Sequence, residues 1–368
     1  MKKLLSAALA LVLCLSLSWT ASARLDPVAQ EALKVGMVYI GGVEDMGYTY
    51  AHHQGALAMA ENLGLAQDQL LWEANVPEDE GCAAALEALV QEGCQLIFAT
   101  SFGFMDYVEQ AAAQYPQVVF SHCSGYKSNE TNFNNYFGRI WEARYLAGIA
   151  AGLKAKEMGN PRLGYVAAYP DVPEVIYSIN AYFLGARSVY PEATLTVQAV
   201  NSWYDPQGER QAAEALIALG CGVLTHDTDS AETVNACQEQ GLYAVGYNAD
   251  MSSAAPGAYL TAPVWDWSGY LTRTARQLID GVWEPVNYLG GMADGLVGLA
   301  PLTDNCAPGT QEEIQKAQTG ILEGSLAVFQ GPLYDNGGHL RVEQGHTLTD
   351  QEILSMSWLC QGVVLNEP

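Results

Sequence analysis

The feature that most constrains this chain is its repeated alternation of short apolar runs with longer segments of helical pattern. Residues 35–40 form such a run, rich in β-branched residues and followed by Gly41 and Gly42, as is typical of a buried parallel strand. From Tyr50 onward the apolar residues recur with helical spacing, and Gly64 fits a helix C-cap. A strand followed by a helix is the repeating unit of a parallel, doubly wound sheet.

The same unit recurs in two series, which predicts two similar α/β lobes. In the first series we expect further strands at 70–73, 95–99 and 117–121 and helices at 81–91 and 106–114. A long alanine-rich helix at 141–158 opens the second series, with strands at 163–167, 194–200, 222–224, 243–247 and 260–264 and helices at 173–190, 206–219, 230–240 and 269–281. A chain of 368 residues is long enough for about two domains. Two such lobes, joined by several crossovers, would place the loops at their strand ends around one cleft.

The loops at the carboxyl ends of these strands are rich in aromatic and acidic side chains. In chain order they carry Glu44, Asp45, Tyr48 and Tyr50; Ser101, Phe102, Phe104 and Asp106; His122, Ser124 and Tyr126; Tyr169 and Glu174; Asn201, Trp203, Tyr204 and Asp205; His226, Asp227, Thr228 and Asp229; Asn248 and Asp250; Trp265, Asp266 and Trp267. Aromatic faces from two lobes can sandwich a flat ring, while carboxylates and amides bond to its edge. We therefore predict an oriented small-molecule pocket.

Simpler explanations exist for the histidines. A lone His122 at a strand end is more often a hydrogen-bonded structural group than a catalytic one. His52 and His53 point about 100° apart on a helix and cannot share one ion, so we expect them in solvated or capping roles. We expect no metal, no cofactor and no catalytic residue. In the same way, 227–230 is first of all an N-cap region for the next helix, with Ser230 or Asp229 at the cap.

Charge excludes several classes of partner. The formal net charge is −25, which argues against nucleic acid, anionic membranes and polyanionic ligands. Lys127 and Arg139 are the basic residues nearest the loops, and a phosphate would need a glycine-rich nest, Lys or Arg, so nucleotides are disfavoured.

The N-terminus indicates export. Residues 1–23 carry Lys2 and Lys3, an apolar stretch and a small-residue cleavage pattern, which together predict a signal peptide and an extracytoplasmic location. Cys14 leaves a lipid tether as an alternative. Seven further cysteines show no metal-like spacing, and we expect buried thiols, although a bond such as Cys82 with Cys94 stays open.

Eight ordered motifs run along the chain, namely GxxxDMGYTYAHHQG (41–55), ATSFGFMD (99–106), FSHCSGYK (120–127), GRIWEARYLAGIAAG (138–152), PEVIYSINAYFLGARSVYP (173–191), VNSWYDPQGER (200–210), HDTDS (226–230) and FQGPLYDNGG (329–338). Together they resemble those of the basic membrane protein family of solute-binding proteins. The resemblance spans nearly the whole mature chain. It implies a type I periplasmic-binding fold, an ABC importer with permease and ATPase subunits as partners, and a purine nucleoside or adenine as ligand.

The resemblance also implies a site. The purine would be stacked between Tyr48 and Trp203, with His122, Asp227 and Asp250 at its polar edge. Together with the strand-end loops, this gives a predicted ligand-binding set of Asp45, Tyr48, Phe102, Phe104, His122, Trp203, Asp227, Asp250 and Trp265. The nucleoside branch carries a Lys near the ribose, and this chain has Trp265, Asp266 and Trp267 in that region, which favours adenine over a nucleoside.

We thus expect a monomeric, non-enzymatic receptor with an N-terminal lobe of 33–137 plus 266–300 and a C-terminal lobe of 138–265 plus 325–368. A secreted α/β enzyme is the alternative from another class, although the chain lacks the G-x-S-x-G and G-x-G-x-x-G motifs that such enzymes carry. A binder of a sugar or another small molecule on the same fold is the third, because fold does not determine ligand.

Overall fold

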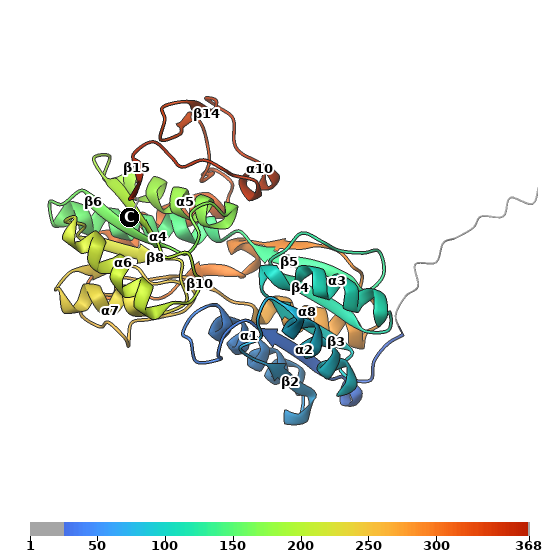
Figure 1. The fold of residues 1–368 in the computed structure, drawn as a ribbon. Coiled ribbons are helices and arrows are strands. Elements are labelled where there is room, and N and C mark those ends of the chain that lie inside the picture. The colour runs from blue at the N-terminus through green and yellow to red at the C-terminus, as the bar shows by residue number, and fades with distance from the viewer. Residues whose placement is uncertain (1–25, 367–368) are drawn as a thin grey trace, which may run out of the picture.

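The computed structural model describes residues 26–366 and shows two parallel sheets, each flanked by helices (Figure 1). The predicted signal peptide and Cys14 lie outside the described residues. Among the helices of 26–366, none is both long and apolar enough to cross a membrane.

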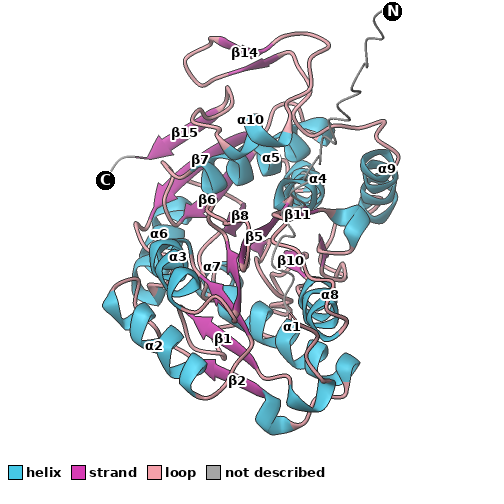
Figure 2. Ribbon diagram, turned by 90° about the vertical axis from the view of Figure 1, so that its right-hand side faces the viewer, coloured by secondary structure: helices cyan, strands magenta, loops and turns pink. Residues whose placement is uncertain are grey.

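The first sheet has six parallel strands in the order β11-β5-β4-β3-β1-β2. Its strands are β1 (Val35–Tyr39), β2 (Leu70–Glu73), β3 (Leu96–Thr100), β4 (Val119–Cys123), β5 (Phe133–Gly138) and β11 (Tyr288–Gly290). Helices α1 (Tyr48–Leu63) and α8 (Ser268–Ile279) cover one face, and α2 (Glu80–Gln91) and α3 (Met105–Gln114) cover the other (Figure 2). The strands β1, β3 and β4 are buried along their whole length, because helices lie on both faces.

The second sheet has five parallel strands in the order β15-β7-β6-β8-β9. They are β6 (Arg162–Ala167), β7 (Thr194–Ala199), β8 (Val223–His226), β9 (Tyr243–Ala244) and β15 (Val363–Asn366). The associated helices are α4 (Ile140–Glu157), α5 (Pro173–Val189), α6 (Pro206–Ala218), α7 (Glu232–Glu239), α9 (Thr310–Leu322) and α10 (Asp350–Leu354). Helices α4 and α5 pack closely because Gly148 and Gly185 leave no side chain between them and the backbone of the facing helix.

Between the two sheets lies a short antiparallel pair, β10 (Pro263–Trp265) with β12 (Val297–Leu299) (Figure 1). The chain passes from the first sheet to the second between β5 and α4, and it returns through β10 to α8. A third passage follows β12. The division into lobes at 33–137 plus 266–300 and 138–265 plus 325–368 remains a prediction.

Several elements differ from the expected ones. The expected strand at 243–247 is reduced to the two residues of β9, and the one at 260–264 is replaced by β10. Helices α9 and α10 and the hairpin of β13 (Leu333–Tyr334) and β14 (Leu340–Val342) were not predicted.

Strand β5 was missed because its interior is polar. Asn134 and Asn135 are nevertheless buried, since Asn134 Nδ2 donates to Val286 O at 2.9 Å and Asn135 Nδ2 donates to His122 O at 3.1 Å. Partners from distant segments accept from both amide nitrogens, whereas Asn134 Oδ1 has no hydrogen-bond partner among the described residues. These polar side chains interrupt the apolar pattern that is typical of a buried strand.

All seven cysteines among the described residues are free thiols, and six of them are buried. Cys82 and Cys94 lie in the core between the first sheet and helices α2 and α3, and they are not joined. Burial raises the pKa of each of these two thiols to about 12, so both behave as small apolar groups.

Candidate functional site

The strand-end loops of the two sheets line an inner cavity, in which about 440 Å³ is not filled by protein atoms when the open solvent at its mouth is included. Its lining comes from both sheets and consists of Ile40, Tyr48, Ser101, Phe102, Ser124, Glu174, Trp203, Asp227, Asp229 and Tyr247. Four predicted residues, Tyr48, Phe102, Trp203 and Asp227, are thus brought together from segments that are far apart in the sequence.

An outer cavity of about 500 Å³ adjoins the inner one and shares Ile40, Trp203 and Asp229 with it. Its remaining lining is acidic, aromatic or small, and comprises Gly41, Gly42, Glu44, Asp45, Asn75, Tyr169, Ser202 and Tyr204. Asp45 belongs to this cavity and not to the inner one. No Lys or Arg side chain is part of either lining within the described chain.

Tyr48 stands at the first turn of α1, and contacts behind it fix its ring. The hydroxyl donates to Cys123 Sγ at 3.0 Å, and the ring meets His52 edge-on at a centroid distance of 4.5 Å. Trp203 follows β7 in the opposite sheet and meets Tyr169 edge-on at 5.3 Å. Each of these two aromatic side chains is therefore held in place by a neighbouring ring and also lines the cavity.

A contact between the two sheets closes the site beside Tyr48. The backbone N–H of Tyr48 donates to Asp229 Oδ1 at 3.2 Å, and Asn248 Nδ2 donates to the same oxygen at 2.8 Å. Burial raises the pKa of Asp229 well above its usual value, and the nearby carboxylate of Asp45 raises it further. Gly47 lies directly against Asp229, without room for a side chain.

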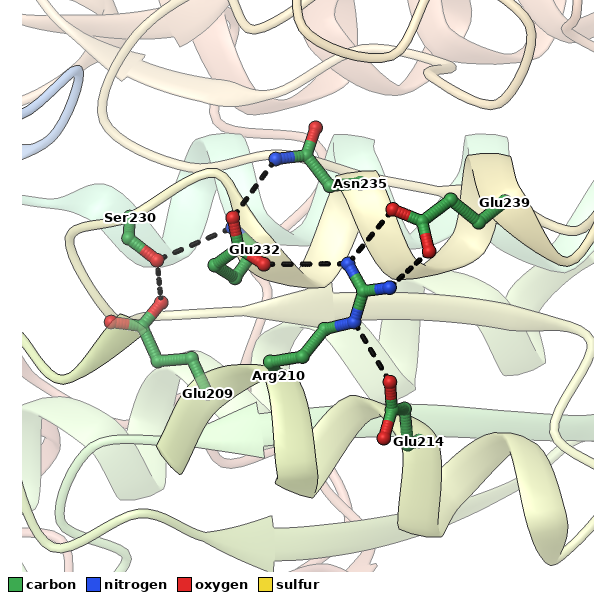
Figure 3. A network of polar contacts seen from close by, with 7 residues as sticks. All are labelled: Glu209, Arg210, Glu214, Ser230, Glu232, Asn235 and Glu239. Atoms are coloured by element: carbon green, nitrogen blue, oxygen red, sulfur yellow. Dashed lines mark hydrogen bonds and ion pairs between the residues drawn. The ribbon is translucent and has the colours of Figure 1, made fainter. Parts of the chain in front are cut away.

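A network within the second sheet's helices holds the loop that carries Asp227 and Asp229. Glu209 Oε2 accepts hydrogen bonds from Thr228 Oγ1 at 2.8 Å and from Ser230 Oγ at 2.6 Å. Beside it, Arg210 pairs with Glu214, Glu232 and Glu239 and so ties α6 to α7 (Figure 3). Ser230 Oγ also accepts from the backbone N–H of Glu232, but the N-cap of α7 is Ala231 and not the predicted Ser230 or Asp229.

Asp227 is held by the protein at both oxygens. Its Oδ1 accepts from Ala168 N at 2.7 Å and its Oδ2 accepts from Tyr165 Oη at 3.2 Å. Burial raises its pKa to about 6 even though the Arg144 guanidinium lowers it. Arg144 is fully buried and lies over the ring of Tyr247, 3.7 Å from its centroid. The sequence reasoning overlooked this cation near the site.

The structure places His122 below the cavity and not in its lining. The ring is fully buried; its Nε2 lies 2.7 Å from Ser101 O, and its Nδ1 accepts from Gly125 N at 3.3 Å. Burial lowers its pKa to about 4, so the ring is neutral. His122 therefore supports the loop of Ser101, and we do not retain it as a reader of the ligand edge.

Three other predicted residues also lie outside both linings. Phe104 is fully buried in the core under α3, because a short helical turn at Phe102–Phe104 sends the two phenylalanines in different directions. Asp250 is exposed and accepts from Ser252 N in a turn. Trp265 is buried and stacks on Trp267 at 4.7 Å, which makes it part of the core between the sheets.

The expectation that His52 and His53 are solvated or capping is wrong. His52 is fully buried and stacks on Trp267 with a centroid distance of 4.2 Å, and His53 is 9% exposed against Tyr39 and Trp72. Burial lowers the pKa of His52 to about 3. Both are neutral core rings. No cluster of three or more His, Cys, Asp or Glu side chains suited to a metal occurs within 26–366.

Six lining residues were absent from the predicted site, namely Ile40, Ser101, Ser124, Glu174, Asp229 and Tyr247. Four of them follow a predicted strand, whereas Ile40 and Tyr247 are each the last residue of one. Glu174 had the clearest signal, because it lies in the first turn of the helix after β6, at the edge of the sheet where α/β proteins bind ligands.

Comparison with known proteins identifies the family. The model of the family described as "ABC transporter substrate-binding protein PnrA-like" matches residues 32–328. The chain belongs to this family. A purine-binding protein of Brucella abortus is 37% identical to this PnrA-like protein over 91% of the chain and 94% of its own length. A Haloferax volcanii protein, named provisionally as a glucose-binding protein of an ABC transporter, is 38% identical over 84% of the chain and 77% of its own length.

Solved structures agree on the fold. A solute-binding protein from Aeropyrum pernix superposes on the PnrA-like chain with a TM-score of 0.68, at 16% identity, and covers 80% of it and 92% of its own length. A second, from Conexibacter woesei, gives 0.66 at 17% identity, with 80% and 97% covered. The chain therefore has the periplasmic-binding-protein fold. Its family makes it a substrate-binding protein of an ABC transporter, a class that works outside the cytoplasm.

Proposed function

We propose that this PnrA-like protein binds a purine base, with adenine preferred, and delivers it to the permease and ATPase subunits of an ABC importer without any catalytic step. The observation that carries this proposal is the inner cavity, where Tyr48 from one sheet and Trp203 from the other line one space together with acidic edge groups. A flat heteroaromatic ring with polar edges matches that combination. The name of the Brucella abortus relative supports a purine.

A free base fits these linings better than its ribosylated forms. The hydroxyls of a ribose need partners once the site closes, and neither described lining offers a cationic donor for them. A nucleotide phosphate would meet Glu44, Asp45 and Asp229 without a cation in the lining. We expect adenine to bind more tightly than adenosine, and adenosine monophosphate not to bind.

The direct test is a ligand panel measured by calorimetry on the mature protein at one salt concentration. It comprises adenine, guanine, adenosine, adenosine monophosphate and glucose. Glucose is included because the Haloferax volcanii relative is named for it and because sugars also stack on aromatic rings. A dissociation constant lower for glucose than for every purine would replace the proposal with a sugar receptor. Slow conversion of any panel member into a product would establish the enzyme alternative.

The stack itself can be tested by removing one ring at a time. Replacing Tyr48 or Trp203 by Ala should weaken adenine binding by about 1 to 3 kcal/mol, as base stacking on aromatic side chains does elsewhere. Trp72→Ala is the matched control, because Trp72 lies on the edge strand β2, outside both cavities, and is 44% exposed. Equal affinities in the Tyr48 and Trp203 variants and the wild type would contradict a ring held between them.

Export and attachment remain part of the proposal. A signal peptide at 1–23 would deliver the chain across the membrane, with Cys14 as the residue that a lipid tether would use. Mass spectrometry of the intact protein from its native membrane fraction distinguishes a cleaved chain that starts at Arg24 from a lipidated one.

A further inference from the structure

Glu174 is the acidic side chain of the inner cavity that the protein itself leaves without hydrogen bonds. It lies in the first turn of α5, lines the cavity and is partly exposed there. Asp227 and Asp229, the other two carboxylates of this lining, each accept two hydrogen bonds from described residues. The carboxyl of Glu174 has no such partner within 26–366. Its pKa is affected only by burial and by the charges of Asp227 and Arg144.

The groups around Glu174 determine its charge. Burial is the main cause that raises its pKa, to about 8; the Asp227 carboxylate adds to this effect and the Arg144 guanidinium opposes it. Arg144 does not form an ion pair with it, because its Nη1 donates to His226 O and its guanidinium lies over the Tyr247 ring. The other titratable groups that interact with Glu174 are neutral, since each has a pKa raised by burial: Tyr48, Cys123, Tyr177 and Tyr247.

We propose that Glu174 reads the purine edge as a neutral carboxylic acid, donating one hydrogen bond and accepting another, and that it thereby determines which purine binds. The inference rests on the proposed function, since it assumes that a purine occupies the inner cavity. A protonated carboxyl offers one O–H donor and one carbonyl acceptor side by side.

The edge of adenine matches this pair of groups. Its amino group is a donor with a ring-nitrogen acceptor on either side, so any two-point contact at that edge needs one donor and one acceptor from the protein. An ionised carboxylate has only acceptors, and its oxygen would face the lone pair of the ring nitrogen. Guanine differs, because its N1–H and its 2-amino group are adjacent donors that suit an ionised carboxylate. The proton on Glu174 thus separates adenine from guanine.

The test is to measure the affinity of the protein for adenine and for guanine from about pH 6 to about pH 9, a range in which both bases stay largely neutral. For the wild type, the adenine dissociation constant should be level up to about pH 8 and rise about tenfold per pH unit above it, because binding then requires uptake of a proton. The ratio of guanine to adenine affinity should rise over the same range.

Glu174→Gln is the decisive variant, because a carboxamide always offers one donor and one acceptor in the same shape. It should bind adenine with a dissociation constant that does not change across this pH range. Glu174→Ala removes both contacts and should weaken adenine binding at least tenfold at pH 6, with its melting temperature recorded as a check on folding. Asp227→Asn removes the carboxylate that adds to the effect of burial on the pKa of Glu174, and the rise in the adenine dissociation constant should begin at a lower pH.

The outcomes separate this inference from the function on which it rests. A wild type that binds adenine with the same affinity from pH 6 to pH 9 would overturn the role of Glu174 alone. The role of Glu174 would also be overturned if the adenine dissociation constant of Glu174→Gln rose above pH 8 as it does in the wild type. A wild type that binds no purine at pH 6 would instead overturn the proposed function, and this inference with it.

Discussion

Replacing Gly47 by Ala should weaken ligand binding without destabilising the ligand-free protein. A Cβ atom at this position would lie 2.6 Å from Asp229 O, 2.7 Å from Asp229 Cβ and 2.8 Å from Asp229 Cα. Ordinary carbon contacts are about 3.5 to 4.0 Å, so the two segments would have to separate by roughly 1 Å. The three nearest atoms all belong to Asp229 in the opposite sheet, and the new methyl group therefore obstructs only the closed arrangement.

The expected loss of affinity in Gly47→Ala follows from the hydrogen bond of the neighbouring residue, Tyr48. Tyr48 N lies 3.2 Å from Asp229 Oδ1, and a further 1 Å would take the pair out of hydrogen-bonding range. Losing a hydrogen bond to a buried carboxyl group costs about 1.5 to 3 kcal/mol. Since that bond connects the two sheets, the loss should appear in the dissociation constant of adenine, as a weakening of about 10- to 100-fold.

Calorimetry with adenine measures the affinity, and small-angle X-ray scattering with and without adenine measures the compaction on binding. Gly42→Ala is the matched control in the same loop, because its Cβ would lie 3.6 Å from Glu44 Oε2, an ordinary contact. The reasoning is refuted if Gly47→Ala binds adenine and compacts as Gly42→Ala does.

Three further predictions concern stability, measured by urea unfolding. Asn132→Ala should cost about 3 kcal/mol while adenine binding is kept, because its Nδ2 donates to three backbone carbonyls; a loss under 1 kcal/mol would show that water replaces it. Gly148→Ala should lower the free energy of unfolding by more than about 3 kcal/mol, because its methyl group would collide with Tyr182 O in the facing helix. By contrast, Gly269→Ala in the open part of α8 should raise the free energy of unfolding by up to about 1 kcal/mol. The pKa of His52 is lowered from 6.5 to about 3, so the unfolded chain binds the extra proton between these values and stability is lost as the pH falls. The stability of a His52→Gln variant should therefore rise relative to that of the wild type as the pH falls below 6.5. A difference in the free energy of unfolding that does not change with pH would contradict a neutral His52.

The sequence was sufficient for the architecture because its evidence is local. Each βα unit shows a short apolar run, a loop and a helical pattern within about 30 residues, and this pattern alone predicts a parallel sheet with ligands at its carboxyl edge. The first unit needed only residues 35–64, and β1 and α1 occupy almost the expected positions. Tyr48 and Trp203 were found in the same way, as aromatic residues in loops that follow predicted strands.

Only the tertiary structure decided which loop residues face the cavity. Phe102 and Phe104 are two positions apart with the same chemistry, yet Phe102 is 52% exposed at the cavity and Phe104 is fully buried in the core. Asp227 was predicted to contact the ligand and Glu174 was not, although both follow predicted strands. Asp227 is already bound by Ala168 N and Tyr165 Oη, 59 and 62 positions away, whereas Glu174 has no such partner among the described residues. Availability for a ligand depends on hydrogen bonds between segments far apart in the chain, and no local pattern records those bonds.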